Sequence, residues 1–253
     1  MALPFADLKG DRLTLHVLQS KAEIAAARAT LELRGLSCLI IPRPSDGVFG
    51  KLLGLTKSQA IGDVRKSWDV LRTADFIEAR FPKDARVLDL GAYNSEILPV
   101  LHRMGFRRLT GIDLNPGLAR MPYGEVIRWQ LGDFLSAPFP DGSFDIVTAI
   151  SVIEHDFDAD RLMSEVSRLL VPDGCFLTSF DYWPDKILTD GIRIFDMSWT
   201  IFSRQDVQAM VERAAAHGLV PEGELTFGGG EPTIHFSDRD YTFAWIVLRK
   251  PGA

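Results

Sequence analysis

Three aspartates recur in the middle of this sequence, each within or directly after an apolar, strand-like stretch. Asp89 lies in "RVLDLG", Asp113 in "TGIDLN" and Asp133 in "QLGDF". In an open α/β sheet, ligands bind beyond the carboxyl ends of the parallel strands. Carboxylates at these ends can accept hydrogen bonds from hydroxyl, amino and ammonium groups. The pattern therefore favours a site for a nucleoside-like cofactor.

Each aspartate has its own expected role. Asp113 can accept both hydroxyls of a ribose, and Asp133 can accept the exocyclic amino group of an adenine, with Phe134 against the ring. Asp89 can serve the cationic end of an amino acid, directly or through water. Gly91 follows the first strand and would let the backbone approach the ligand without a Cβ in the way.

The elements that must position these side chains alternate between strand-like and helix-like patterns. Strands are expected over 85–91, 107–115, 124–133, 143–151, 175–182, 219–227 and 241–250, and helices over 63–81, 96–105, 158–174 and 203–218. Such alternation gives βαβ units with helices on both faces. It predicts a Rossmann-like, doubly wound, mostly parallel seven-stranded sheet. The last two strands have no helix between them, so an antiparallel strand is expected at the sheet edge.

The first 60 residues do not follow this alternation. Residues 13–35 form an Ala-rich amphipathic pattern with a strand-like start, and the stretch after them is rich in turn-forming residues. We place a domain boundary near residue 60. Residues 1–60 are then an N-terminal helical extension that serves as a lid, a dimerisation element or a substrate-binding element, and residues 61–253 form the α/β domain.

These features occur in an order that resembles the class I S-adenosylmethionine-dependent methyltransferases, over about residues 65–182. The family's first motif, D-x-G-x-G-x-G, maps to Asp89, Gly91, Tyr93 and Ser95. The segment "GDF" at 132–134 is similar to the family's adenine-contacting segment. "FPDGSFDIVTAISVIEH" and "SEVSRLLVPDGCFLTS" are similar to the fourth-strand region, the next helix and the fifth strand of the small-molecule methyltransferase group.

The resemblance implies that residues 61–253 form a methyltransferase domain with S-adenosylmethionine as its cofactor. The residues expected to bind this cofactor are Asp89, Gly91, Ala92, Tyr93, Asp113, Leu114, Asp133, Phe134, Ile150, Arg65 and Trp68. Arg65 can meet the methionine carboxylate. Trp68 lies on the helix that often closes over the cofactor in this family, with core packing as the alternative.

The first motif departs from the family pattern at its second and third glycines. Tyr93 and Asn94 must make the turn, and Asn tolerates the left-handed conformation better than most residues. The loop can still bind the cofactor after this change because S-adenosylmethionine has no pyrophosphate to hold.

Two alternative functions follow from the departure. One is a catalytically silent relative that binds a partner through its N-terminal helix. The other is a dinucleotide-dependent oxidoreductase, for which Tyr93 and Glu96 replace two glycines of G-x-G-x-x-G.

The acceptor side is expected beyond the fourth strand. There His155 is a candidate general base for a hydroxyl acceptor, and Asp181 can add a carboxylate. The alternative is that the Glu-His pair only holds its loop. A divalent metal on His155, Asp156 and Asp181 is not expected. Residues 181–202 insert aromatic side chains that can wall the acceptor pocket. The expected reaction is O-methylation of a small molecule, such as a saccharide or a secondary metabolite.

Composition and net charge limit the classes of binding partner that we expect. The net charge is −6 with a pI near 5.4, and no basic run is present, so a nucleic-acid partner is not expected. The two cysteines, Cys38 and Cys175, lie in apolar runs without metal-type or redox-type spacing. No stretch resembles a signal peptide or a membrane-spanning segment, so we expect a cytoplasmic protein without membrane insertion. A small-molecule substrate and a homodimer are the expected partners.

Overall fold

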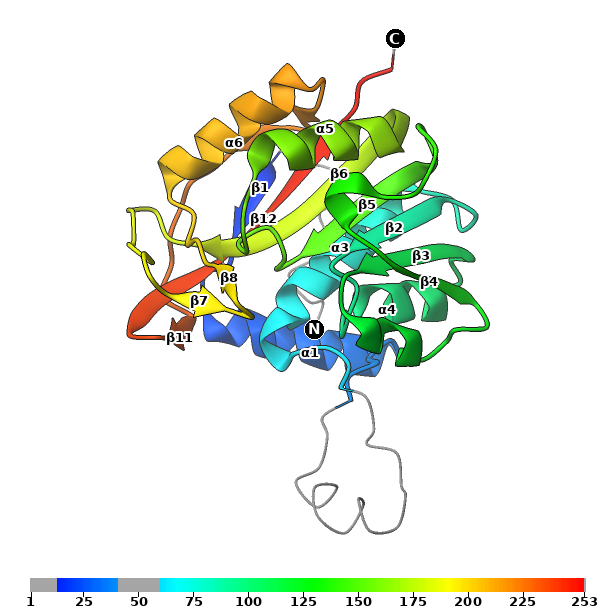
Figure 1. The fold of residues 1–253 in the computed structure, drawn as a ribbon. Coiled ribbons are helices and arrows are strands. Elements are labelled where there is room, and N and C mark those ends of the chain that lie inside the picture. The colour runs from blue at the N-terminus through cyan, green and yellow to red at the C-terminus, as the bar shows by residue number, and fades with distance from the viewer. Residues whose placement is uncertain (1–12, 41–59, 253) are drawn as a thin grey trace.

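A computed structural model describes residues 13–40 and 60–252 of the chain, and its centre is one mixed β-sheet (Figure 1). The order across the sheet is β10-β1-β12-β6-β5-β2-β3-β4, with β9 and β11 also paired to β12. The strands are β1 Leu13–Val17, β2 Arg86–Leu90, β3 Arg108–Asp113, β4 Ile127–Leu131, β5 Phe144–Ile150, β6 Leu170–Tyr182, β9 Val220–Pro221, β10 Glu224–Leu225, β11 Ile234–Phe236 and β12 Arg239–Arg249. A separate hairpin consists of β7 Arg193–Ile194 and β8 Met197–Ser198.

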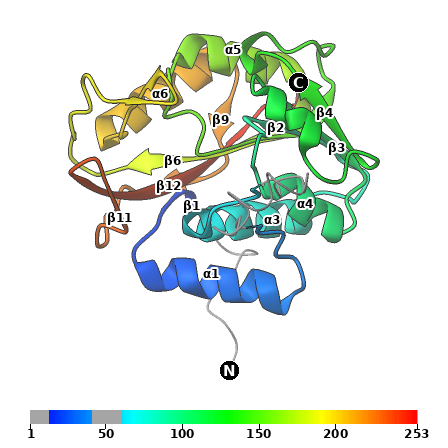
Figure 2. The ribbon, with the colours of Figure 1, turned by 60° about the horizontal axis from the view of Figure 1, so that its bottom comes forward.

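Helices cover both faces of the sheet (Figure 2). One face carries α1 Lys21–Leu33, α3 Ser67–Arg80 and α4 Ile97–Arg103, and the other carries α5 Ala159–Leu169 and α6 Arg204–Ala216. Short 3₁₀ turns complete the connections: η2 Val64–Lys66, η3 Pro116–Arg120 and η4 Phe134–Ser136. The start of α6 is fixed by a capping box between Ser203 and Asp206, which satisfies backbone donors that the helix leaves free.

The strand order places a topological switch point between β2 and β5. From β2 the chain runs outward through β3 and β4, and it then returns to continue on the other side through β5 and β6. All pairings among these five strands are parallel. Their carboxyl ends therefore lie on one edge of the sheet, where a doubly wound fold binds its ligand. The predicted Rossmann-like, mostly parallel fold is confirmed.

The antiparallel strand is not at the edge of the sheet. β12 pairs with β6 on one side and with β1 on the other, and β1 in turn pairs with β10. The sheet is thus wider than the seven strands predicted. The reason is burial, because residues 241–248 of β12 are all buried and need a partner strand on each side. Residues 13–17, expected in a separate extension, supply that partner. The domain boundary near residue 60 stays a prediction.

Within the described residues, no helix combines the length and the apolar character that crossing a membrane requires.

Candidate functional site

The three aspartates lie along the carboxyl edge of three adjacent strands. Asp89 is the fourth of the five residues of β2, and Asp113 is the last residue of β3. Asp133 follows β4 and caps η4 through a hydrogen bond from the backbone N of Leu135 to its Oδ1, at 2.8 Å. Because β2, β3 and β4 are parallel neighbours, the three carboxylates share one side of the molecule, next to the switch point.

Asp89 is a buried carboxyl group with one oxygen left over. Its Oδ1 accepts a hydrogen bond from Thr148 Oγ1 of β5 at 2.7 Å, and its Oδ2 is buried without a hydrogen-bond partner. The residue is only 1% exposed. Burial raises the pKa of Asp89 to about 7, against the lowering effect of the Thr148 hydrogen bond. An unpartnered buried oxygen at a strand end is where a ligand donor would bind.

Asp113 fastens the loop after β2 to the end of β3. Its Oδ2 accepts from the backbone N of Tyr93 at 2.9 Å, and its Oδ1 accepts from the backbone N of Asn115 at 2.7 Å. A carboxylate has about four lone-pair positions, so two remain for a ligand. The side chain is half-buried.

The loop makes its turn with one glycine and one asparagine. Gly91 has φ +68°, and Asn94 has φ +61°, so the predicted left-handed turn at Asn94 is confirmed. Gly91 also has a packing role, and its expected approach to a ligand stays a prediction. A Cβ there would lie 2.5 Å from Cγ2 of Val152, so the glycine admits Val152 as a packing partner. Nothing in this geometry requires a ligand to explain Gly91.

Tyr93 is half-buried. Its ring packs on η3, where a Cβ on Gly117 would lie only 2.5 Å from Tyr93 Cε2. Tyr93 borders a small apolar cluster of Ala92, Leu118 and Met121. The side chain that replaces a family glycine is therefore used for packing. Ala92 itself is fully buried in this cluster, which leaves only its backbone for a ligand.

The other predicted cofactor residues differ in exposure. Leu114 is 67% exposed, and Ile150 and Phe134 are half-buried on either side of the sheet. Arg65 is exposed and pairs with Asp63, with its Nε 2.9 Å from Asp63 Oδ2. Its guanidinium is thus already engaged by a carboxylate of its own chain. Contact of these residues with a cofactor stays a prediction.

Trp68 lies in the hydrophobic core under the sheet, and it is 2% exposed. Its indole Nε1 is buried without a hydrogen-bond partner. The guanidinium carbon of Arg72 lies 5.1 Å from the centre of its ring. Trp68 therefore packs in the core, which was the alternative to a role in covering the cofactor. A cofactor contact of Trp68 stays a prediction.

The acceptor-side pair His155 and Asp181 lies beyond β5 and at the end of β6. Asp181 is buried, and its Oδ2 accepts from Trp199 Nε1 at 2.8 Å. His155 is half-buried, and its Nδ1 is buried without a partner. Burial lowers the pKa of His155, against the raising effect of the Asp181 charge, so the imidazole is held neutral near pH 7.

Asp156 does not join this pair. Its Oδ1 accepts from the backbone N and the Oγ of Ser198, both at 2.7 Å, so it holds the β7–β8 hairpin. Among the residues that the structure describes, no group of three or more His, Cys, Asp or Glu side chains could hold a metal ion.

Three charged residues at this side were not singled out from the sequence: Lys66, Asp69 and Glu154. Lys66 donates to Ser151 Oγ, its Nζ lies 3.8 Å from Asp181 Oδ1, and it sits 3.4 Å above the centre of the Phe243 ring. Asp69 and Glu154 are 0% and 2% exposed. Glu154 could have been found from its place in the Glu-His pair. Asp69 gave no signal, because a charged residue in an amphipathic helix is normally read as solvent-facing.

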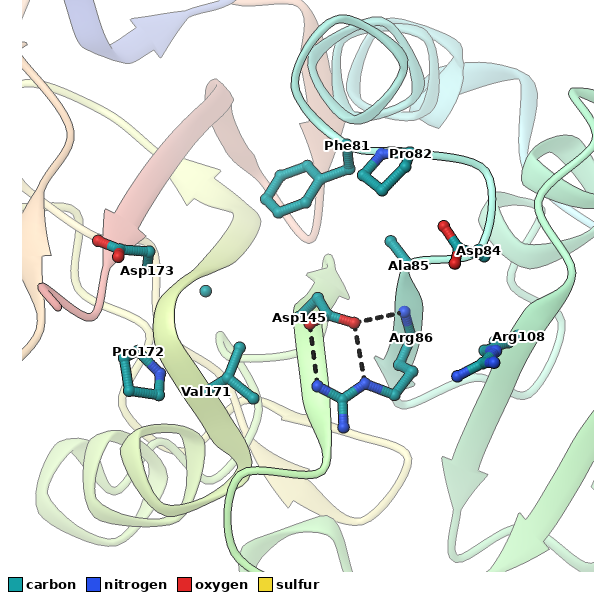
Figure 3. Close-up of a pocket in the computed structure, with 11 residues that line it drawn as sticks. Phe81, Pro82, Asp84, Ala85, Arg86, Arg108, Asp145, Val171, Pro172 and Asp173 are labelled. Atoms are coloured by element: carbon teal, nitrogen blue, oxygen red, sulfur yellow. Dashed lines mark hydrogen bonds and ion pairs between the residues drawn. The ribbon is translucent and has the colours of Figure 1, made fainter.

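A hollow at the opposite edge of the sheet has a structural explanation. It lies at the amino ends of β2 and β5, where Figure 3 shows Arg86 bound to Asp145. Arg86 Nη2 lies 2.9 Å from Asp145 Oδ1, and its Nε and backbone N lie 2.9 and 2.7 Å from Oδ2. The pair ties two strands together and uses the donors that a ligand would need. A doubly wound fold binds ligands at the other edge.

Comparison with known proteins finds similarity to methyltransferases. Residues 88–178 match the family described as "Methyltransferase domain". The chain is 34% identical over 117 residues to EEF1A lysine methyltransferase 4 of Mus musculus, a match covering 38% of this chain and 46% of that protein. The match thus spans less than half the length of that curated relative.

Solved structures support the fold. Phosphoethanolamine N-methyltransferase 2 of Haemonchus contortus superposes with a TM-score of 0.53 at 16% identity, covering 71% of this chain and 52% of that one. The cyclase SpnF superposes with a TM-score of 0.52 at 16% identity, covering 96% of this chain and all of the other. Proteins with different named activities thus share this architecture, so function must be argued from the site.

Proposed function

We propose that this chain, whose residues 88–178 match a methyltransferase domain, transfers a methyl group from S-adenosylmethionine to a hydroxyl group of a small molecule. The observation that carries the proposal is the edge formed by Asp89 and Asp113. The first has an unpartnered buried oxygen, and the second holds the loop that follows β2. Both lie beside the switch point between β2 and β5.

The residues present fit the cofactor. Asp89 Oδ2 would accept from the ammonium of the methionine portion, because it is the buried acceptor that lacks a donor. Asp113 would accept from the ribose hydroxyls with its remaining lone pairs, and Asp133 from the adenine amino group. When bound, S-adenosylmethionine supplies an electrophilic methyl group on a sulfonium sulfur.

His155 is the proposed proton acceptor. His155 Nδ1 would take the proton of the acceptor hydroxyl as that oxygen received the methyl group that bound S-adenosylmethionine supplies. That nitrogen is buried, lacks a partner and belongs to a ring whose lowered pKa keeps it neutral. Asp181 would stabilise the imidazolium that results, because its charge raises the pKa of His155.

The aromatic insertion supports a small, ring-bearing acceptor such as a saccharide or a secondary metabolite. Phe195 is 80% exposed on the β7–β8 hairpin, and its ring centre lies 5.8 Å from that of His155. Exposed aromatic rings beside a site provide a stacking surface for sugar or aromatic rings. A homodimer and a cytoplasmic location remain predictions.

Turnover with a panel of hydroxylated small molecules tests the proposal. We expect formation of S-adenosylhomocysteine from S-adenosylmethionine to depend on the acceptor. His155→Gln should lower kcat by about 10²-fold or more, the usual contribution of general base catalysis. The cofactor affinity of the variant should remain unchanged. Turnover of an accepted substrate that is equal in the variant and the wild type would remove His155 from this role.

A further inference from the structure

Three buried carboxylates lie near one lysine at the carboxyl ends of β5 and β6, and we name this set the carboxylate cluster. Its members are Asp69 of α3, Glu154 after β5, Asp181 of β6 and Lys66 of η2. The proposed reaction uses Asp181 of this set, through His155, and leaves the other members without a role. All three carboxylates are at most 6% exposed.

The cluster is short of hydrogen-bond donors. Ser179 Oγ donates to Asp69 Oδ2 at 2.9 Å, and Trp199 Nε1 donates to Asp181 Oδ2 at 2.8 Å. Asp69 Oδ1 and Glu154 Oε2 are buried and have no partner. Buried oxygens without partners are costly and uncommon in folded proteins. The cluster thus contains two buried acceptor oxygens for which the structure gives no donor.

The cluster is also short of positive charge. Lys66 lies 3.8 Å from Asp181 and brings one ammonium to three carboxyl groups. Burial raises the pKa of Asp69 to about 6 and of Glu154 to about 8, and it raises the pKa of Asp181. Without a ligand, protons thus supply the missing charge.

We propose that the carboxylate cluster binds the amino group of the methyl acceptor as an ammonium ion. The inference rests on the proposed function and narrows its substrate class to hydroxylated small molecules that carry an amine. An ammonium brings three donors and one charge, which match the two unpartnered oxygens and the excess of carboxylates. A metal ion is the weaker alternative, because the described residues hold no metal-type group.

Proton release should accompany binding. An ammonium stabilises the ionised carboxylates, so the cluster loses protons when the ligand binds, and affinity rises with pH through the range of the raised pKa values. Three other groups interact electrostatically with Asp181. The charge of His155 lowers the pKa of Asp181, and Asp181 in turn raises the pKa of Arg65 and of Tyr241 on β12.

Binding of two small probes tests the inference. With protein saturated by S-adenosylhomocysteine, we expect 2-aminoethanol to bind at least tenfold more tightly than ethylene glycol, measured by ligand-observed NMR titration. The affinity for 2-aminoethanol should increase at least threefold between pH 6 and pH 8.5. Glu154→Gln and Asp69→Asn should each remove most of this preference. Glu212→Gln, an exposed carboxylate on α6, is the matched control and should retain it.

Equal affinity for the two probes, or a flat pH profile, would overturn the inference. The wild-type comparison decides the matter even when a variant does not fold. Failure of S-adenosylhomocysteine to bind at all would contradict the proposed function. Binding of that ligand without any preference for the amine would overturn only the inference.

Discussion

At the residue scale, Asp89 combines a cost to stability with a proposed role in binding. Its pKa is about 7 in the folded protein and near 3.8 in the unfolded chain. The folded state therefore holds its proton more tightly, and stability that is present below pH 4 is lost as pH rises through 7. Proteins retain such groups at sites where a ligand supplies the missing interaction.

This linkage gives a prediction for Asp89→Asn, which keeps the shape of the side chain without an ionisable group. In the absence of ligand, the variant should gain stability relative to wild type between pH 5 and pH 8. The expected gain is at least about 1.4 kcal/mol, the equivalent of one pKa unit. Urea unfolding at the two pH values measures it. A stability difference that does not change with pH would contradict the pKa assigned to Asp89.

The sequence was sufficient to locate the aspartates but not their surroundings. Asp89, Asp113 and Asp133 were identified because each lies within or directly after an apolar, strand-like stretch. The end of such a stretch is a local feature that the sequence shows. The packing of Tyr93 on Gly117 and the burial of Asp69 depend on contacts between distant elements. No local pattern carries that information, so the sequence alone did not predict that Tyr93 packs on η3.

At the element scale, a buried ion pair connects α1 to the loop before α4. Arg28 Nη2 lies 2.8 Å from Glu96 Oε2, and Arg28 Nη1 lies 3.0 Å from Oε1. Glu96 Oε1 also accepts from the backbone N of Cys38 at 2.8 Å. Glu96 occupies the last glycine position of the dinucleotide pattern, so the residue that breaks that pattern anchors the N-terminal helix to the loop that follows β2.

Removal of one partner of this pair should be costly. Arg28→Met leaves the Glu96 charge buried and unpaired, and we expect a loss of about 3–5 kcal/mol in the free energy of unfolding. The surface pair of Arg80 and Glu222 provides the control, and Arg80→Met should cost about 1 kcal/mol or less. Denaturant unfolding measures both variants. Similar losses of unfolding free energy in the two variants would show that the buried pair stabilises the fold no more than the surface pair does.

Element positions were largely predictable, whereas the neighbours of each strand were not. Helix α5 and strands β2, β3 and β5 follow from periodicity, since each pattern is complete within its own segment. The pairing of β1 with β12 joins residues 15–17 to residues 244–246, across most of the chain. Five residues before a helix gave only a weak strand signal, so an interior position in the sheet was not predicted.

At the scale of the whole molecule, the N-terminal segment is part of the sheet. Leu15 and Val17 are buried in the core on the α5 and α6 face, and β1 covers one side of β12. We therefore expect a chain of residues 61–253 to lose cooperative thermal unfolding, because an apolar strand would be left unpaired. Circular dichroism melting against the full chain measures this. Equal cooperativity in the two chains would support the boundary near residue 60 and contradict the structural role of β1.

The proposed function depends on the binding of S-adenosylmethionine or its product by Asp89 and Asp113 at the switch point. Isothermal titration of the wild-type protein with S-adenosylhomocysteine tests it most directly, with Asp113→Ala as the variant and Glu212→Gln as the control. The account predicts saturable binding to one site, at least tenfold weaker in Asp113→Ala, which is about 1.4 kcal/mol, and unchanged in the control. Absence of binding at millimolar ligand, or equal affinity in Asp113→Ala, would contradict it.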